Sequence, residues 1–283
     1  MKTIVITGAS GFVGSSLKKR FLEIGYNVIA TKRDDLHNIE KLSSILNGVE
    51  VVINLAGANI INRWSESYKK LLYSSRIDTT KALVSAMSLC EIKPKTFIST
   101  SAVGIYKNDT LYDEKTQNLS NDFLGKLCQE WEKEALKAND IGVRVSIFRF
   151  GIVMGEGGAL AKMLTPFKLG LGGTIGDGTQ SFSFIHIKDL VKAYEFVIDN
   201  DNLSGIFNLT APVPTTNYGL TKALGDNLHR PTLLPIPQFV LNLILSEGAK
   251  VLTDGQSAVP NHLLESGFVF EYKTIDETIK DLV

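Results

Sequence analysis

The chain has 283 residues, 44% of them hydrophobic and 21% charged, which is typical of a globular protein with a sizeable core. Thirty basic residues balance thirty acidic ones, so no net charge favours nucleic acid or an anionic membrane as a partner. No apolar run approaches the roughly 18 residues of a membrane span and no signal-peptide pattern is visible, so we expect a cytoplasmic location. Cys90 and Cys128 are expected to be buried, reduced thiols, and the histidines have no neighbours of ligand type, so we expect no metal.

Residues 3–14 are the most informative stretch: an apolar run, Ile4-Val5-Ile6, followed by three glycines at a spacing of three. The pattern predicts a buried parallel strand, a turn and a helix that opens at the last glycine. Gly8 would allow the tight turn, Gly11 would let the backbone approach phosphate, and Gly14 would let the helix pack closely on the strand. We therefore predict a dinucleotide site, with contacts from Thr7, Gly8, Ser10, Gly11, Phe12, Val13 and Gly14.

Two alternatives to this dinucleotide site are less satisfactory. A glycine-rich turn without a ligand does not explain three glycines where one or two turn residues suffice. A mononucleotide P-loop needs Lys followed by Ser or Thr after the last glycine, and Ser15-Ser16 stands there instead.

Strand-like and helix-like segments alternate as far as residue 150, which predicts an α/β fold with a doubly wound parallel sheet of the Rossmann type. We expect residues 1–155 to form the dinucleotide-binding domain, joined by parts of 183–210, and residues 156–283 to form a smaller mixed lobe over the cleft. After the first strand and helix, the expected strands are 27–31, 50–55, 95–100 and 143–149, and the expected helices are 38–46, 65–91 and 121–139. Further on we expect a glycine-dense loop at 170–178, an aromatic strand at 182–187 and a short helix near 238–246.

Ligands of such sheets bind outside the carboxyl ends of the strands, so the residues that follow each strand are candidates. Lys32 and Arg33 follow the second strand, where a guanidinium can hold the 2′-phosphate of NADP; NAD is the less favoured cofactor. The alternative is a solvated basic pair, with Asp34 and Asp35 as ribose ligands. The third strand is followed by further cofactor candidates, Leu55, Ala56 and Gly57.

Several motifs along the chain belong together. They are Thr7-Gly8-x-x-Gly11-x-x-Gly14, Asn54-Leu55-Ala56-Gly57, Ser99-Thr100-Ser101-Ala102, Arg149-x-Gly151-x-Val153-x-Gly155, Arg63-Trp64, residues 166–180, Ile185-His186-Ile187-x-Asp189, Gly255-Gln256-x-Ala258-x-Pro260 and Gly267-Phe268-x-Phe270. In these motifs the chain resembles the extended short-chain dehydrogenases/reductases, and in particular an atypical branch, the YfcH-like NAD(P)-dependent epimerase/dehydratase family. The resemblance covers essentially the whole chain and implies a Rossmann fold and a nicotinamide cofactor, without supplying the substrate.

Reductases of this superfamily donate a proton from a Tyr, whose pKa is lowered by a Lys four residues later. The expected helix contains Lys126, which the resemblance makes a ribose contact, but Asp122 stands where the Tyr belongs. We therefore expect the standard acid/base dyad to be missing. Ser101 matches the hydroxyl that polarises the substrate, and Tyr106 is the candidate replacement donor; a capping or core serine and a packing tyrosine are the alternatives.

Gln180 and His186 are expected on the substrate side, although Gln180 could instead bond the loop's own backbone and His186 could be a core residue. Asp189 is expected to be a helix N-cap. Two functions follow: an NADP-dependent oxidoreductase or epimerase acting on a small polar, for example nucleotide-linked, substrate, or a non-catalytic NADP-binding sensor. The oligomeric state, monomer or homodimer, is left open.

Overall fold

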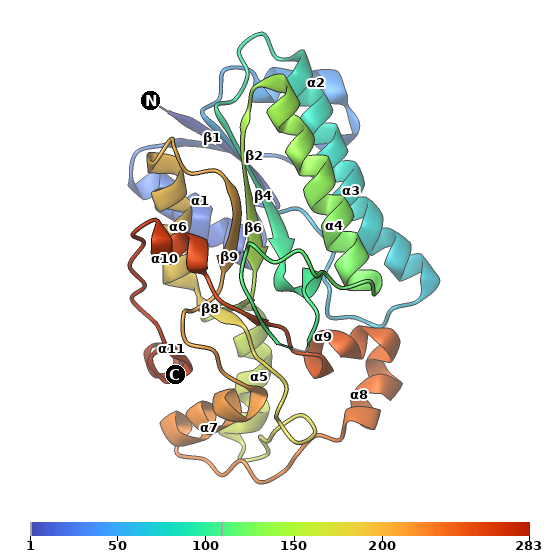
Figure 1. Ribbon diagram of the computed structural model, residues 1–283, viewed down its shortest axis with the longest axis vertical. Coiled ribbons are helices and arrows are strands. Elements are labelled where there is room, and N and C mark those ends of the chain that lie inside the picture. The colour runs from blue at the N-terminus through green and yellow to red at the C-terminus, as the bar shows by residue number, and fades with distance from the viewer. Residues whose placement is uncertain (1, 109) are drawn as a thin grey trace.

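The computed structural model describes residues 2–108 and 110–283, which are built around a parallel six-stranded sheet (Figure 1). Strand β1 lies between β2 and β3, with Ile4 opposite Val28 on one side and Val51 on the other. The order of the strands therefore reverses between β1 and β3, and we call the carboxyl edge of the sheet at this point the crevice. In spatial order the strands are β2 (Asn27–Ala30), β1 (Thr3–Thr7), β3 (Val51–Asn54), β4 (Thr96–Ala102), β6 (Arg144–Phe150) and β9 (Gly205–Leu209).

Helices cover both faces of this sheet, which confirms the predicted doubly wound α/β architecture (Figure 1). Helices α1 (Phe12–Glu23) and α6 (Ile187–Asp199) pack together on one face. On the other face α2 (Ile39–Leu46) packs on α3 (Glu66–Leu89), and α3 packs on α4 (Phe123–Leu136).

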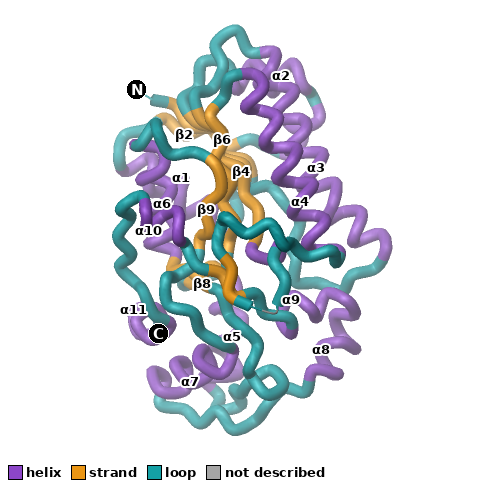
Figure 2. The backbone as a smooth tube through the Cα atoms, viewed as in Figure 1, coloured by secondary structure: helices purple, strands orange, loops and turns teal. Residues whose placement is uncertain are grey.

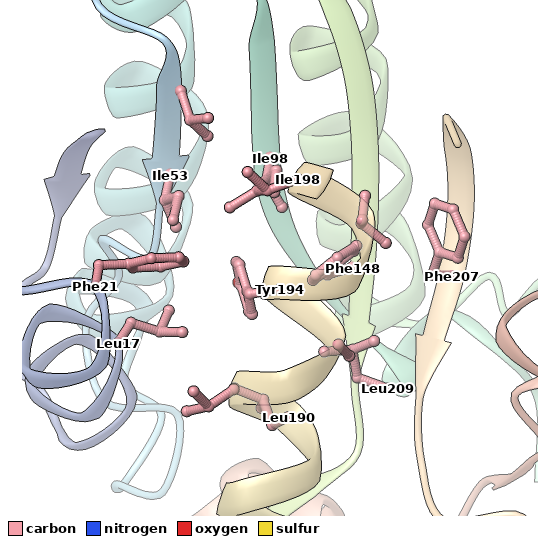
Figure 3. Close-up of a cluster of buried hydrophobic side chains, with 14 of the residues drawn as sticks. Leu17, Phe21, Ile53, Ile98, Phe148, Leu190, Tyr194, Ile198, Phe207 and Leu209 are labelled. Carbon is pink, nitrogen blue, oxygen red and sulfur yellow. The ribbon is translucent and has the colours of Figure 1, made fainter. Parts of the chain in front are cut away.

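Two apolar layers hold the helices to the sheet because the strands are buried on both faces. Ile4 and Ile6 point into the layer under α1 and α6, whereas Val5 points into the layer under α2 and α3. Figure 3 shows the first layer, in which Tyr194 of α6 lies against Phe148 of β6 with ring centroids 4.6 Å apart.

The rest of the chain forms a looser region in which loops predominate (Figure 2). Its strands pair in twos, β7 with β8 and β5 with β10. Strand β9 lies in the main sheet, so the sheet draws residues from well beyond 155. The remaining elements are β5 (Leu111–Tyr112), β7 (Ile152–Met154), α5 (Gly158–Lys168), β8 (Phe184–His186), α7 (Asn217–Leu228), α8 (Gln238–Leu245), α9 (Lys250–Thr253), β10 (Ser257–Ala258), α10 (Asn261–Glu265) and α11 (Ile275–Leu282), with short 3₁₀ turns at 33–37, 103–105, 137–141 and 246–249.

One expectation about a helix end is wrong. The aromatic strand stops at His186, whose side chain caps α6 by accepting a hydrogen bond from the amide of Lys188. Asp189, expected as the cap, lies inside the first turn, and its carboxylate accepts the amides of Glu271 and Tyr272. Its burial raises the pKa of Asp189 against the effect of these bonds. The two cysteines are free and buried, as expected.

The apolar layer under α6 predicts a stability effect. Leu190→Ala should lower the free energy of unfolding by about 2–5 kcal/mol, because Leu190 is fully buried and its loss leaves a cavity. Leu169→Ala is the matched control, since Leu169 is 68% exposed and should change stability by less than about 0.5 kcal/mol. Urea unfolding of both variants measures this, and equal losses would contradict the packing described.

Candidate functional site: a crevice at the carboxyl edge of the sheet

Three glycines shape the turn that leaves β1. Gly8 has a φ of +67°, which only glycine adopts readily, and a Cβ there would lie 2.8 Å from the carbonyl oxygen of Leu55. A Cβ on Gly14 would lie 2.3 Å from the carbonyl oxygen of Gly8. The first glycine thus forms the turn beside β3, and the third lets α1 pack directly on it.

Gly11 is different because its free side is open. A Cβ there would meet only the Gly8 carbonyl, at 3.3 Å, and Gly11 caps α1 without any side-chain bond. The first amides of a helix lack partners within the helix and carry its positive dipole end. A backbone that can be approached this closely at a helix N-terminus fits a pyrophosphate.

Thr7 links this turn to β3. Its hydroxyl donates to Oδ1 of Asn54 at 2.7 Å and accepts the amides of Leu55 and Ala56 at 3.1 and 3.2 Å. The Thr7 hydroxyl therefore connects the two sides of the crevice. Thr7 is fully buried.

At the end of β2, Arg33 is exposed and has no hydrogen bond or ion pair with any described residue. Asp35, the acidic alternative, is already engaged: it accepts the amide of Lys32 at 2.8 Å and pairs with Lys41 at 2.6 Å. The hydrogen bond from Lys41 lowers the pKa of Asp35. Asp34, the other acidic alternative, is exposed, and like that of Arg33 its side chain has no hydrogen bond or ion pair with a described residue. Arg33 and Asp34 are therefore both free to meet a ligand, whereas Asp35 is not.

Phe12, the first residue of α1, contacts the glycine-rich segment 155–158. Added Cβ atoms on Gly155, Gly157 and Gly158 would each come within 3 Å of its ring. The bare backbone of this glycine-rich segment therefore lies against the first residue of α1.

The expected catalytic hydroxyls, Ser101 near the end of β4 and Tyr106 just beyond it, belong to a buried polar network. Ser101 donates to Glu132 at 2.6 Å, and Arg149 forms a two-point ion pair with the same carboxylate at 2.7 and 2.8 Å. Arg149 also donates to the Tyr106 hydroxyl at 2.8 Å, which in turn donates to Asn208 at 2.9 Å. Only 1% of Ser101 and of Tyr106 is exposed.

Charge and burial act in opposite directions in this network. Burial raises the pKa of Tyr106 despite the adjacent guanidinium. Burial disfavours the charge on Arg149, but the hydrogen bonds and charge of Glu132 more than offset it and raise the pKa of Arg149. The network therefore contains a firmly ionised guanidinium and a neutral phenol that is hard to ionise.

The phase of α4 determines which residues face this network. Gly125 packs against Ser120, where a Cβ would lie 2.3 Å from the carbonyl oxygen, and this turns Cys128 and Glu132 toward β4. Lys126 is exposed, and its contact with a ribose stays a prediction. Asp122 caps the helix by accepting the amide of Gly125 at 2.7 Å. The dyad positions are thus occupied by a cap and a solvated lysine.

Cys128 on the inner face of α4 is not a substitute base. Burial raises the pKa of its thiol to about 12, so the thiol stays protonated at neutral pH. One Tyr and Lys in the sequence have the spacing of the dyad, Tyr218 and Lys222. They lie on α7, where Tyr218 is 59% exposed and Lys222 pairs with Asp226. That helix packs near α5 and α11, away from β4 (Figure 1).

The two substrate-side candidates both have structural partners. The Gln180 amide donates to the carbonyl of Ile175 at 3.1 Å, within the glycine-dense loop. The His186 ring is fully buried, lies 3.1 Å from Asp281 of α11 and stacks on Tyr272. Burial lowers the pKa of His186 to about 4, so the ring is neutral at neutral pH.

A surface pocket opens next to Tyr106, and its lining is mainly polar. Lys107 and Asp122 contribute charged groups to it, and Gln256 approaches from the C-terminal segment. Among the residues described, no group of three His, Cys, Asp or Glu side chains is placed to hold a metal ion. In the same part of the chain, no helix combines the length and apolar character needed to cross a bilayer.

The model of the NAD dependent epimerase/dehydratase family matches residues 4–210, and a domain of unknown function, DUF1731, matches residues 236–282. The chain belongs to the NAD dependent epimerase/dehydratase family. It is 36% identical to epimerase family proteins of Staphylococcus aureus strain MRSA252 and of Staphylococcus haemolyticus, covering 100% of this chain and 99% of each relative.

Solved structures agree with this assignment. The human epimerase family protein SDR39U1 (isoform 2), solved with NADPH, is 30% identical with a TM-score of 0.92, over 99% of this chain and 98% of that one. The nucleoside-diphosphate sugar epimerase from Corynebacterium glutamicum is 29% identical with a TM-score of 0.80, over 99% of this chain and 59% of that one. The fold is therefore that of NAD(P)-binding epimerases and reductases.

The buried ion pair predicts a large stability effect. Glu132→Ala should lower the free energy of unfolding by about 3–5 kcal/mol, because it leaves the Arg149 guanidinium buried without its carboxylate. Glu265→Ala is the control: its pair with Lys115 is exposed, so solvent screens it and its loss should change stability little. Chemical denaturation compares the two, and a loss at Glu132 no larger than the control's would show that the pair is not buried in solution.

Proposed function

We propose that the protein binds NADP(H) in the crevice between β1 and β3 and acts as an NADP-dependent oxidoreductase or epimerase on a small polar substrate. The observation that carries the proposal is the open backbone at Gly11, at the N-terminus of a helix that lies directly against the turn. Family membership and a relative solved with NADPH support the choice of cofactor class.

Arg33 supports NADP over NAD within this proposal. It follows β2, where an NAD site offers an acidic residue to the ribose, and its guanidinium is exposed and unpaired among the described residues. A planar guanidinium matches a phosphate with two parallel hydrogen bonds. Asp35 is engaged with Lys32 and Lys41 and is poorly placed to act as a ribose ligand.

When bound, the nicotinamide would supply the hydride chemistry, and the residues of this chain bind and orient. The polar pocket beside Tyr106 is suited to a small polar substrate. Ser101 and Tyr106 remain the catalytic candidates because both lie close to the carboxyl end of β4. For either hydroxyl to serve a substrate, its hydrogen bond to Glu132 or Asn208 has to break.

That engagement favours a second candidate function, a non-catalytic protein in which NADP occupancy is sensed by a partner. The unmutated protein should be assayed for NADPH oxidation against a broad panel of carbonyl compounds and nucleotide sugars. Turnover supports the oxidoreductase, and its absence in a protein that binds NADPH supports the sensor.

Cofactor preference should depend on Arg33. We expect NADPH to bind more tightly than NADH, and Arg33→Ala to reduce that preference by about 1.5–3 kcal/mol, the size of a charge-assisted contact. Arg230→Ala, which removes an exposed arginine near α7, should leave the preference unchanged. Calorimetry measures both affinities, and equal affinity for the two cofactors in the unmutated protein would refute this choice.

Removing the Tyr106 hydroxyl distinguishes a packing role of this residue from a role as proton donor. We expect Tyr106→Phe to lower the free energy of unfolding by about 1–3 kcal/mol, since Arg149 and Asn208 lose a buried partner. A tyrosine that only packs would leave turnover within threefold of that of the unmutated protein. A folded variant that binds NADPH but loses about 10²–10⁴-fold in turnover would instead identify Tyr106 as a general acid.

A further inference from the structure

Arg76 is the arginine whose surroundings the cofactor motifs do not explain. It projects from α3 onto the loop that follows β3, and a Cβ on Gly57 would lie 3.2 Å from its guanidinium carbon. Gly57 comes two residues after Leu55, and a Cβ added to Gly8 would lie 2.8 Å from the carbonyl oxygen of Leu55. The guanidinium therefore lies at the crevice, one strand away from the glycine turn.

The charge of Arg76 is not neutralised within the described residues. The chain has seven arginines; three of them, Arg20, Arg144 and Arg149, lie within 4.0 Å of a carboxylate, and three others, Arg33, Arg63 and Arg230, are exposed to solvent. Arg76 alone is partly buried without a carboxylate. Its hydrogen bonds go to the carbonyls of Leu72 and Ala58, at 3.2 and 3.0 Å.

These two hydrogen bonds fix the position of the guanidinium but leave its charge without a carboxylate and its other N–H donors without partners among the described residues. It lies over the Trp131 ring, 5.3 Å from the centroid, and Trp131 is held by a hydrogen bond to Thr80. An arginine has five N–H donors, and only two have partners here. A fixed cation with spare donors at a ligand crevice is suited to an oxyanion, since arginine stays charged and pairs with phosphate in two-point geometry.

We infer that Arg76 binds a phosphate oxyanion of a ligand that crosses Gly57. The inference rests on the proposed dinucleotide site, because that site places the ligand in this crevice. The phosphate belongs either to the cofactor's own pyrophosphate or to a second, phosphorylated ligand beside the bound cofactor. Gly57 is required on this account because any side chain there would press on the guanidinium.

The test compares Arg76→Gln with Arg230→Gln, an exposed arginine that also bonds a backbone carbonyl. Three affinities are measured by calorimetry: NADPH, inorganic pyrophosphate on the free protein, and inorganic pyrophosphate on the NADPH-loaded protein. We expect Arg76→Gln to weaken at least one of them by about 10- to 100-fold, and Arg230→Gln to weaken none. Weaker NADPH binding assigns the cofactor's phosphate, and a loss confined to pyrophosphate on the loaded protein assigns a second ligand.

Affinities of Arg76→Gln within twofold of the unmutated protein in all three titrations would overturn the inference. Such a result, with NADPH still bound, leaves the dinucleotide site intact, whereas failure of the unmutated protein to bind NADPH refutes the site itself; the pyrophosphate titration of the free protein then decides on Arg76. If Arg76→Gln does not fold, Arg76→Lys and Gly57→Ala replace it. Arg76→Lys keeps the charge without the planar fork, and Gly57→Ala displaces the guanidinium. Each should therefore weaken at least one of the three affinities, by a smaller factor than expected for Arg76→Gln.

Discussion

The contact between Gly14 and Gly8 is the constraint on which the rest of the structure depends. With only 2.3 Å between a Cβ on Gly14 and the Gly8 carbonyl oxygen, α1 can begin directly against the turn only if residue 14 has no side chain. That contact sets α1 against β1, opens the amides of the helix N-terminus toward the crevice and brings the turn onto Leu55 of the neighbouring strand. The geometry of the turn before α1, where we propose that phosphates bind, is therefore determined by backbone packing.

A second constraint is the ion pair between Glu132 and Arg149, which joins α4 to β6 beneath the end of β4. Desolvating two charges is costly, and the pair offsets that cost with two short hydrogen bonds, a bond from Ser101 and a bond to Tyr106. The consequence for function is direct. The Ser101 and Tyr106 hydroxyls are used here to satisfy buried charge, so neither can donate to a substrate without breaking a hydrogen bond.

The strands, the flanking helices and the glycine turn after β1 could be predicted from the sequence, because hydrophobic periodicity and glycine spacing are local signals. It did not predict the phase of α4, since Lys126 and Cys128 are both compatible with a helix and only the packing of Gly125 on Ser120 decides which faces β4. Arg149 carried a usable signal: a charge within an apolar strand, Val145 to Phe150, needs a buried counter-ion. Arg76 carried none, because an arginine on a long helix is usually solvated. The prediction that Asp189 caps α6 is wrong because the aromatic strand runs directly into the helix, so that its last residue, His186, is the cap.

Amide hydrogen exchange with and without saturating NADPH tests whether the crevice between β1 and β3 binds NADP(H). We expect slower exchange in residues 8–14 and 55–57, where backbone amides would meet or border the phosphates, with little change in α10 and α11. Unchanged exchange in residues 8–14, or protection confined to the C-terminal region beyond residue 210, would contradict it.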